Sequence, residues 1–180
     1  MKALAALFLL MLSFPSFSNE EVYLSPDKFI DKTFSEEPEQ HYFWLTKPHK
    51  SKVSSILGRK PNQIRIKYWG KGVRTAWILD EIGKEQPITV GITVEEDKIK
   101  GLHVLIYRES RGYEVKQSFF TEQYIGATLD KKLDLTQNID GITGATLSVR
   151  ALNKLARVAL YLHKQSPFSR HEQTAALDKS

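Results

Sequence analysis

The residues best suited to chemistry in this chain stand between positions 140 and 148, where a polar segment with two glycines leads into an apolar helix pattern. The first N–H groups of a helix have no partner within it, and the helix dipole favours negative charge there. A phosphate on the Thr146 hydroxyl would lie in that field, and Gly144 and Ala145 leave room for a bulky group to reach it. The candidate residues of this segment are Asp140, Gly141, Thr143, Gly144, Ala145, Thr146 and Leu147.

The helix that must position this segment is expected to continue to about His163. Its apolar side chains recur at helical spacing and therefore form one stripe for burial. The members of the stripe are Ala151, Leu152, Leu155, Val158, Ala159 and Leu162. On spacing alone, an ordinary helix start is the simpler interpretation, because Thr or Ser before an apolar run is a common N-cap.

The pattern Asp-x-x-Thr-Gly-Ala-Thr at positions 140–146 resembles the flavinylation motif of the periplasmic FMN-binding domain family. That family includes the C subunit of the sodium-translocating NADH:quinone reductase and the G subunit of the Rnf complex. The resemblance implies that a flavin transferase links FMN to Thr146 through a phosphoester. It also implies that Asp140 orients Thr146 or binds the Mg²⁺ that the transferase uses, whereas a plain Asx turn is the alternative for Asp140.

A looser part of the resemblance is the turn at Arg108–Glu114, because the family carries a Glu-and-Gly turn at about this place. Glu109 and Gly112 are similar to it. The resemblance places Arg108 or Glu109 at the polar edge of the flavin and Tyr113 on its face. A solvated turn is an equally good interpretation of the same residues.

A second Gly-Ala-Thr occurs at residues 125–129 and tests how specific the first one is. Here Ile125 stands where the motif has Thr, and Glu122 stands where it has Asp. Two lysines follow, and there is no sustained apolar stripe behind them. We interpret this copy as a turn in which Gly126 ends a short helix.

The rest of the chain alternates short helices with hairpins. Alternating apolar and polar residues predict two hairpins, at about 64–79 and 88–107. Cap and breaker residues predict short helices at 25–34, 46–58 and 118–124. The expected fold class is α+β: an antiparallel sheet built from hairpins and packed with helices, with the FMN attachment at the N-terminus of the last helix.

Two groups of aromatic residues have roles that spacing does not decide. Phe119 and Phe120 are both expected to point inward from their short helix. Tyr42, Phe43 and Trp44 offer either a flavin-stacking patch or, more commonly for such a cluster, part of the core.

The chain of 180 residues is long enough for one domain with a real core. A basic start, an apolar run at Ala3–Leu12 and the small-x-small pattern ending at Ser18 indicate a secretory signal cleaved after Ser18. An uncleaved N-terminal anchor is the alternative. We divide the chain into a signal peptide (1–18), an N-terminal elaboration of the same domain (19–84), the FMN-binding domain (85–166) and a flexible tail (167–180).

Composition excludes several classes of protein. The chain has no Cys, which excludes lipoprotein attachment, disulfides, iron–sulfur ligation and a Cys-x-x-Cys-His haem site. Its five His residues lack zinc-type spacing, and no Gly-x-Ser-x-Gly elbow is present. The formal net charge of +5 is too diffuse to indicate nucleic-acid binding, but it would favour an acidic redox partner or peripheral contact with an anionic membrane.

The sequence therefore predicts an exported, periplasmic electron-transfer flavoprotein with FMN covalently linked through its phosphate to Thr146. A flavin transferase is the expected maturation partner, and a c-type cytochrome or a membrane quinone-linked dehydrogenase is the expected redox partner. Electron transfer is favoured over a stand-alone oxidoreductase, and we assign no catalytic residues and no metal ligands. The alternative function is an exported basic binding module without a redox cofactor, in which the Thr146 motif is only a helix cap.

Overall fold

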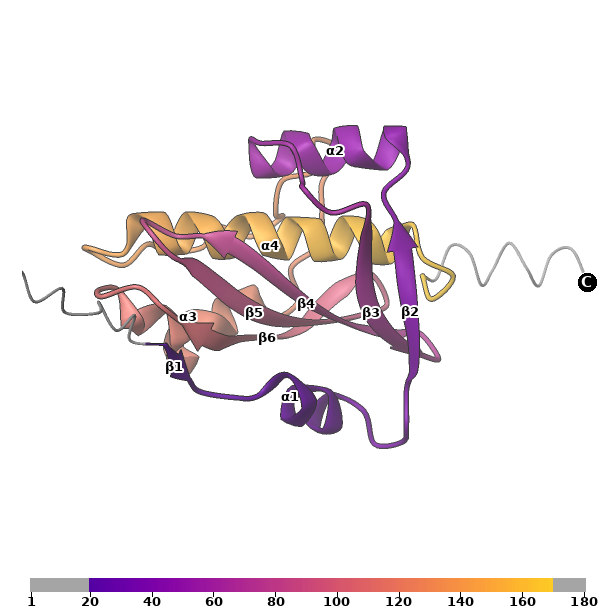
Figure 1. The fold of residues 1–180 in the computed structure, drawn as a ribbon, viewed down its shortest axis with the longest axis horizontal. Coiled ribbons are helices and arrows are strands. Elements are labelled where there is room, and N and C mark those ends of the chain that lie inside the picture. Colours follow the sequence, from indigo (N-terminus) through magenta and orange to yellow (C-terminus); the bar gives the residue numbers. More distant parts are fainter. Residues whose placement is uncertain (1–19, 170–180) are drawn as a thin grey trace, which may run out of the picture.

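One antiparallel sheet organises the computed structural model, which describes residues 20–169 (Figure 1). Its six strands follow the order β1-β6-β5-β4-β3-β2, so each strand from β2 to β6 lies beside its neighbour in the sequence. All neighbouring strands are antiparallel, which confirms the predicted α+β class. The strands are β1 (Glu21–Val22), β2 (Glu39–Trp44), β3 (Arg65–Lys71), β4 (Arg74–Ile82), β5 (Pro87–Glu95) and β6 (Lys98–Tyr107).

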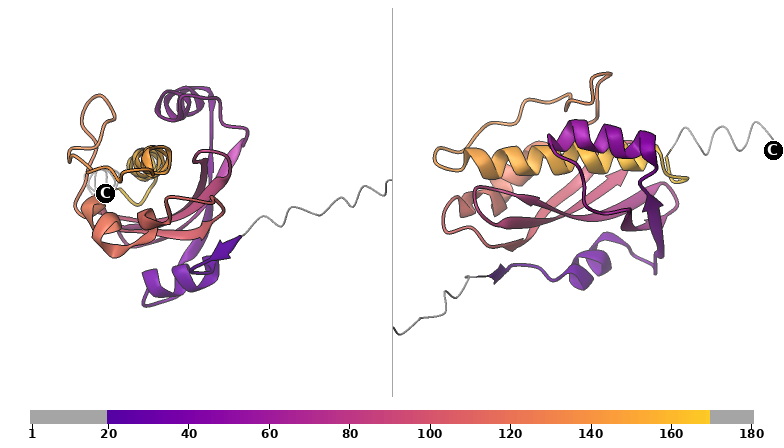
Figure 2. Two further views of the ribbon diagram at one scale, coloured as in Figure 1. Left: turned by 90° about the vertical axis from the view of Figure 1, so that its left-hand side faces the viewer. Right: turned by 45° about the horizontal axis from the view of Figure 1, so that its top comes forward.

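Helices cover both faces of this sheet (Figures 1 and 2). The long helix α4 runs along one face with α2 beside it, and α1 lies on the opposite face. Two short 3₁₀ helices, η1 and η2, flank α3 after β6. The helical elements are α1 (Pro26–Thr33), α2 (Lys47–Leu57), η1 (Tyr113–Lys116), α3 (Ser118–Thr121), η2 (Glu122–Tyr124) and α4 (Thr146–Lys164).

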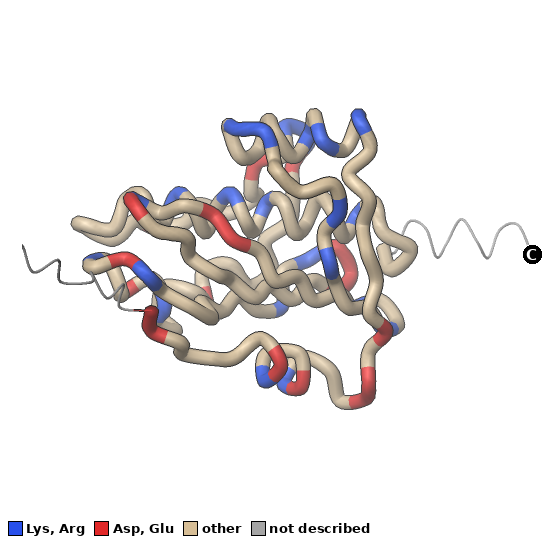
Figure 3. Tube along the Cα trace, in the orientation of Figure 1, with Lys and Arg blue, Asp and Glu red and all other residues tan. Residues whose placement is uncertain are grey.

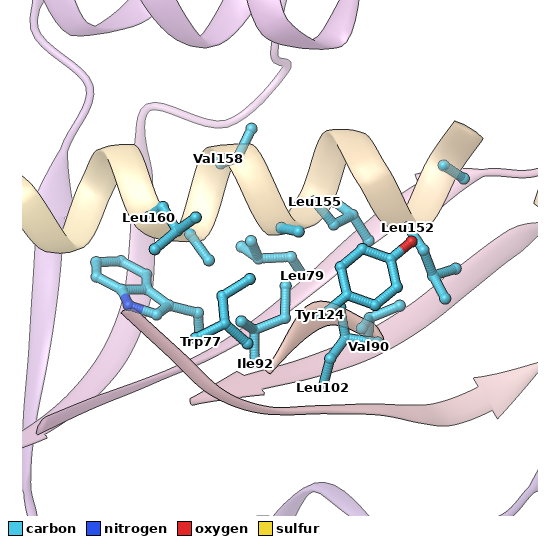
Figure 4. Packing of buried hydrophobic residues seen from close by; sticks show 14 of the residues in the cluster. Trp77, Leu79, Val90, Ile92, Leu102, Tyr124, Leu152, Leu155, Val158 and Leu160 are labelled. Carbon is cyan, nitrogen blue, oxygen red and sulfur yellow. The ribbon is translucent and has the colours of Figure 1, made fainter. Parts of the chain in front are cut away.

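The main core lies between α4 and the sheet (Figure 4). All six residues of the predicted apolar stripe of α4 are buried, because the helix packs on β4, β5 and β6. Trp77, Ile92 and Leu102 meet them from the sheet and are themselves at most 2% exposed. On the far side of α4, α2 adds a second layer, towards which Val158 points (Figure 4), and the Tyr161 hydroxyl lies 2.9 Å from Nδ1 of His49 in α2.

Local signals explain where the shorter helices begin and end. The Ser25 hydroxyl accepts a hydrogen bond from the Lys28 N–H (3.4 Å) and Pro26 occupies the first turn, as predicted for α1. Helix α2 ends at Gly58, whose φ of 73° is the left-handed conformation that glycine adopts easily. Both predicted hairpins are present as β3–β4 and β5–β6.

The structure also differs from the sequence expectations at particular positions. Strands β1 and β2 were not predicted, and they form the two edges of the sheet. Phe120 is buried as expected, but Phe119 is 63% exposed, so the prediction that both point inward was wrong. Phe43 belongs to the core, whereas Tyr42 and Trp44 are exposed.

The end of the described chain remains packed beyond the expected domain boundary at residue 166. The Phe168 ring contacts His41 and Tyr68 and covers Gly70, and Ser169 is buried. The remaining residues of the expected tail and the expected signal peptide lie outside the described residues. Among residues 20–169, no helix has the length and apolar character needed to cross a membrane.

Candidate functional site

The start of α4 offers backbone donors that no side chain uses. Ala145 occupies the N-cap position and has no side-chain oxygen, so no side-chain hydrogen bond caps the helix. The first backbone bond of the helix runs from the Val149 N–H to the Ala145 carbonyl (3.0 Å). Thr146, the first helical residue, is exposed. This helix start therefore presents an accessible hydroxyl next to N–H groups that favour an anion.

A cavity of about 510 Å³ opens directly at this helix start. The β4–β5 turn contributes Lys84 to its wall, and the loop after β6 contributes the segment 109–111. The first residues of α4 and the loop before it form the other side. The residues that line the cavity are Lys84, Glu109, Ser110, Arg111, Gly144, Ala145, Thr146, Leu147 and Ser148.

Tyr107, at the end of β6, joins the loop after β6 to the first turn of α4. Its hydroxyl donates to the Arg111 carbonyl (2.6 Å) and lies 3.1 Å from the Ser148 hydroxyl. Burial raises the pKa of Tyr107, so its hydroxyl keeps the proton that it donates. The two walls of the cavity are therefore held together by one buried side chain.

Gly112 brings the same loop close to the start of α4. Its φ of 81° is left-handed, and a Cβ built on it would lie 3.0 Å from the Ala145 Cβ and 3.1 Å from the Tyr107 hydroxyl. A larger residue would therefore be strained and would press on Ala145. Ala145 is only 4% exposed, so its small size permits this contact, and it also lines the cavity at Thr146. Gly144 does leave open space, because nothing lies within 4 Å of its Cβ position.

Glu109 fixes the β4–β5 turn rather than projecting freely from a solvated loop. Its Oε1 accepts hydrogen bonds from the backbone N–H groups of Lys84, Glu85 (2.7 Å) and Gln86 (3.0 Å). The turn is also closed by a hydrogen bond from the Gly83 N–H to the Gln86 carbonyl (3.0 Å). This arrangement holds Lys84 at the cavity wall.

Two cations therefore face the uncapped helix start across one cavity. Lys84 and Arg111 both line it and are both exposed. Together with the helix dipole, their charges favour a phosphate or phosphodiester near Thr146. The sequence did not indicate Lys84, because only the β4–β5 pairing and the Glu109 hydrogen bonds bring it to this site. Ser110, Arg111 and Ser148 lie within segments that the sequence singled out, but they were not assigned to the site.

The earlier part of the motif lies beside the cavity and not in its wall. Asp140 is exposed, and its N–H donates to the Gln123 side chain (2.8 Å). The side-chain NH₂ of Gln137 donates to the Gln123 carbonyl (2.6 Å), which ties the loop to η2. Ile142 packs against the main core. Gly141 and Thr143 are exposed, as Asp140 is. The carboxylate of Asp140 and the hydroxyl of Thr143 are therefore accessible to a partner protein.

Arg108 and Tyr113 do not line this cavity. The Arg108 guanidinium donates to the Pro87 carbonyl (3.1 Å) and the Thr89 hydroxyl (3.0 Å), and it pairs with Glu20 (3.1 Å). Its contacts are thus with β5 and the N-terminal segment. Tyr113 lines a neighbouring cavity of about 350 Å³, which shares Glu109 and Ser110 with the first.

The second Gly-Ala-Thr copy has a different environment. The Thr128 hydroxyl lies 3.1 Å from the Thr136 hydroxyl, and no helix starts there. Gly126, with a left-handed φ of 84°, follows the short helix η2, as predicted. Asp130 accepts hydrogen bonds from the N–H groups of Lys132 (2.8 Å) and Asp134 (2.9 Å), which forms a further turn. The exposed Tyr42 and Trp44 lie on β2, at the opposite edge of the sheet from β1 and β6. Neither lines the cavity at Thr146.

Comparison with known proteins identifies the segment that contains this site. Residues 83–161 match the family described as the FMN-binding domain. The matched segment runs from the β4–β5 turn into α4 and includes every residue that lines the cavity. These residues therefore form an FMN-binding domain. No curated protein matches the chain.

Proposed function

We propose that this FMN-binding domain serves an exported electron-transfer flavoprotein, in which FMN is attached through its phosphate to Thr146. The observation that carries the proposal is the exposed Thr146 hydroxyl at an uncapped helix start, in a cavity that Lys84 and Arg111 also line. The family match supports flavin binding, and the site geometry supports the point of attachment.

The residues present fit a flavin phosphate. The α4 N–H groups and the two cations would hold the phosphate, and the open space at Gly144 would admit the part of FMN that joins the phosphate to the ring system. Tyr113, in the neighbouring cavity, offers an aromatic face for the ring system. When bound, FMN would supply one- and two-electron transfer, which the side chains of this protein cannot perform themselves.

Attachment at Thr146 requires a flavin donor whose phosphate is activated as an anhydride. The Thr146 hydroxyl would lose its proton to the transferase, and its oxygen would bond to the flavin phosphorus. The bond from phosphorus to the leaving group would break at the same centre. Asp140 and Thr143 are exposed next to the site and are therefore placed to be recognised by the transferase.

The remaining parts of the proposal concern export and electron exchange. We place the protein in the periplasm, with residues 1–18 as a signal peptide cleaved after Ser18. The chain has no Cys to ligate an iron–sulfur cluster or attach a c-type haem. We therefore propose that electrons pass between the flavin and separate proteins, such as a c-type cytochrome or a membrane quinone-linked dehydrogenase.

Intact mass and in-gel flavin fluorescence after export in a host with the flavin transferase test this function. We expect a mass increase of one FMN less one water, and fluorescence that survives denaturation. The Thr146→Ala variant should lose both signals, whereas Thr146→Ser keeps a hydroxyl and should retain part of the loading. Thr128→Ala is the matched control and should load normally. A wild-type protein that stays colourless, or full loading of Thr146→Ala, would contradict the proposal.

A further inference from the structure

Charged residues are unevenly distributed along this chain, in a region away from the proposed flavin site. Between residues 40 and 79 there are nine Lys or Arg residues and no Asp or Glu, so all 21 acidic residues lie elsewhere. This stretch comprises all of β2 except Glu39, together with α2, β3 and most of β4. In Figure 3, α2 carries blue segments and no red one. Three of the nine cations pair with acidic residues from other parts of the chain, namely Arg59 with Glu81, Lys71 with Glu36 and Arg74 with Glu95. No ion pair joins Arg65, Lys67 or the lysines of α2 to an acidic residue among residues 20–169.

The same stretch exposes large aromatic side chains on one side of the sheet. Along β2, Phe43 points into the core, so its neighbours Tyr42 and Trp44 point to the other side, where they are 43% and 57% exposed. Along β3, Arg65 and Lys67 point to that same side, because Ile66 between them is buried.

Pairing between the strands places Arg65 against the aromatic rings of β2, whereas the Lys67 ammonium lies 4.7 Å from the centre of the Trp69 ring. Trp44 pairs with Arg65 and Tyr42 pairs with Lys67 in the antiparallel register. The Arg65 guanidinium lies 4.3 Å from the centre of the Tyr42 ring and 5.6 Å from that of Trp44. We call Tyr42, Trp44, Arg65 and Lys67, on the free edge of the sheet, the β2–β3 face.

We propose that the β2–β3 face binds an anionic lipid surface. Exposed Trp and Tyr next to Arg and Lys are the combination that anchors proteins at a membrane interface, where the rings enter the headgroup region. The cations are attracted to anionic lipids, and no acidic residue of this stretch opposes them. Surface binding of this kind needs no groove, which suits a projecting sheet edge.

The position of the face also favours a membrane over an electron-transfer partner. The cavity at Thr146 is lined from the loop after β6, and β6 lies four strands away from β2. Four strand spacings amount to about 19 Å. A redox protein docked on the β2–β3 face would be held away from the cavity, whereas a lipid surface there would hold the protein and leave the cavity free. This inference does not rest on flavin binding.

Vesicle binding by the exported protein tests the proposal. Co-sedimentation should show binding to vesicles that contain phosphatidylglycerol, weaker binding as salt rises, and no binding to pure phosphatidylcholine. Lipids brominated in their acyl chains should quench the tryptophan fluorescence, and Trp44→Phe should remove most of that quenching. A retained N-terminal segment would add binding to both lipids but would not make the quenching depend on Trp44.

Charge-reversal variants distinguish binding through this face from attraction by the net charge of the protein. Arg65→Glu combined with Lys67→Glu should weaken binding to anionic vesicles roughly tenfold or more. Lys131→Glu with Lys132→Glu changes the net charge equally on an exposed loop and should have a clearly smaller effect. Equal losses in the two double variants, quenching that survives Trp44→Phe, or no binding to anionic vesicles at low salt would each overturn the proposal. Binding to an acidic protein without any vesicle binding would assign the face to a protein partner instead.

Discussion

Gly112 supports the attachment segment through a contact that no larger side chain can make. It combines a left-handed φ of 81° with an approach of 3.0 Å between its Cβ position and the Ala145 Cβ. Ala145 precedes Thr146, the proposed acceptor, so the glycine sets how the first turn of α4 sits against the loop after β6. This contact explains why the looser part of the sequence motif includes a glycine at this position.

We predict that Gly112→Ala destabilises the protein by about 1–3 kcal/mol, because it adds backbone strain and a clash with Ala145. It should also lower flavin loading. Thermal melting and flavin absorbance measure the two effects. Gly141→Ala is the control, since nothing lies within 4 Å of the Gly141 Cβ position and its φ is ordinary. Equal melting temperatures for the two variants would show that the contact does not matter.

Asp140 provides a prediction of the opposite kind, in which loading changes but stability does not. Its carboxylate is exposed and has only a long contact with the Asn138 side chain (3.4 Å). We predict that Asp140→Ala lowers flavin loading and changes the free energy of unfolding by about 0.5 kcal/mol or less. Flavin absorbance per protein, read beside a melting curve, checks this. Normal loading would remove Asp140 from the site.

At the residue scale, the sequence allowed us to predict the residues that are close together in the chain, but not their distant neighbours. The exposed Thr146 at the start of α4 was predicted. Arg108 was placed near the flavin, yet its guanidinium bonds to β5, because strand alternation points it away from the cavity. Lys84 reaches the site only through tertiary contacts, so no local pattern indicated it.

The β4–β5 turn depends on one carboxylate from a loop 25 residues away in the chain. Hydrogen bonds from three backbone N–H groups to Glu109 Oε1 are charge-assisted and thus stronger than those between neutral groups. We predict that Glu109→Ala destabilises the protein by about 2 kcal/mol and speeds hydrogen exchange at the amides of residues 84–86.

The matched control for Glu109→Ala is Glu85→Ala. Glu85 lies in the same turn, is exposed and forms only a surface ion pair with Lys84 (3.1 Å). Its loss should cost about 0.5 kcal/mol or less. If Glu109→Ala leaves hydrogen exchange at residues 84–86 unchanged, the carboxylate does not hold the turn.

Among the elements, periodicity predicted α4 and both hairpins, whereas the two edge strands were missed. In β2 the inward-pointing Phe43 and the outward-pointing Tyr42 and Trp44 are all aromatic. The strand therefore lacks the alternation of apolar and polar residues that usually indicates a strand. Strand β1 has only two residues, too few for any period. Phe119 points outward because the helical segment after η1 is short and buries only one side.

Stability of the whole molecule should depend on pH through His163, which is fully buried where α4 meets the sheet. Its Nδ1 lies 2.8 Å from the Thr75 hydroxyl, and its Nε2 lies 3.4 Å from Asp97. Burial lowers the pKa of His163 to about 4, although the Asp97 charge acts in the other direction. The unfolded chain, with an ordinary His pKa of about 6.5, therefore takes up the proton first as the pH falls.

We predict that His163 makes the protein less stable as the pH falls from about 6.5 towards 4, by up to roughly 3 kcal/mol. The measurement is the melting temperature between pH 5 and 7, where most carboxylates remain ionised. His163→Asn has no such group and should show a flatter profile. A wild-type profile as flat as that of His163→Asn would contradict the assignment.

At the scale of the molecule, the proposed attachment site and the β2–β3 face lie at different edges of one sheet. The β2–β3 face belongs to residues outside the matched FMN-binding segment, which begins at residue 83. Composition indicated a mildly basic protein, but only the strand register shows that the exposed aromatic and basic residues share one side. The residues before the matched segment thus contribute a surface as well as the four strands β1 to β4.

The most direct test of the central claim is to locate the flavin on the chain by digestion and fragmentation mass spectrometry of the exported, flavin-loaded protein. We predict a single modified peptide that contains residues 140–150, with the flavin phosphate on Thr146. The same experiment on Thr146→Ala should give no modified peptide. A flavin on the peptide that contains Thr128, or on any residue other than Thr146, would contradict the account.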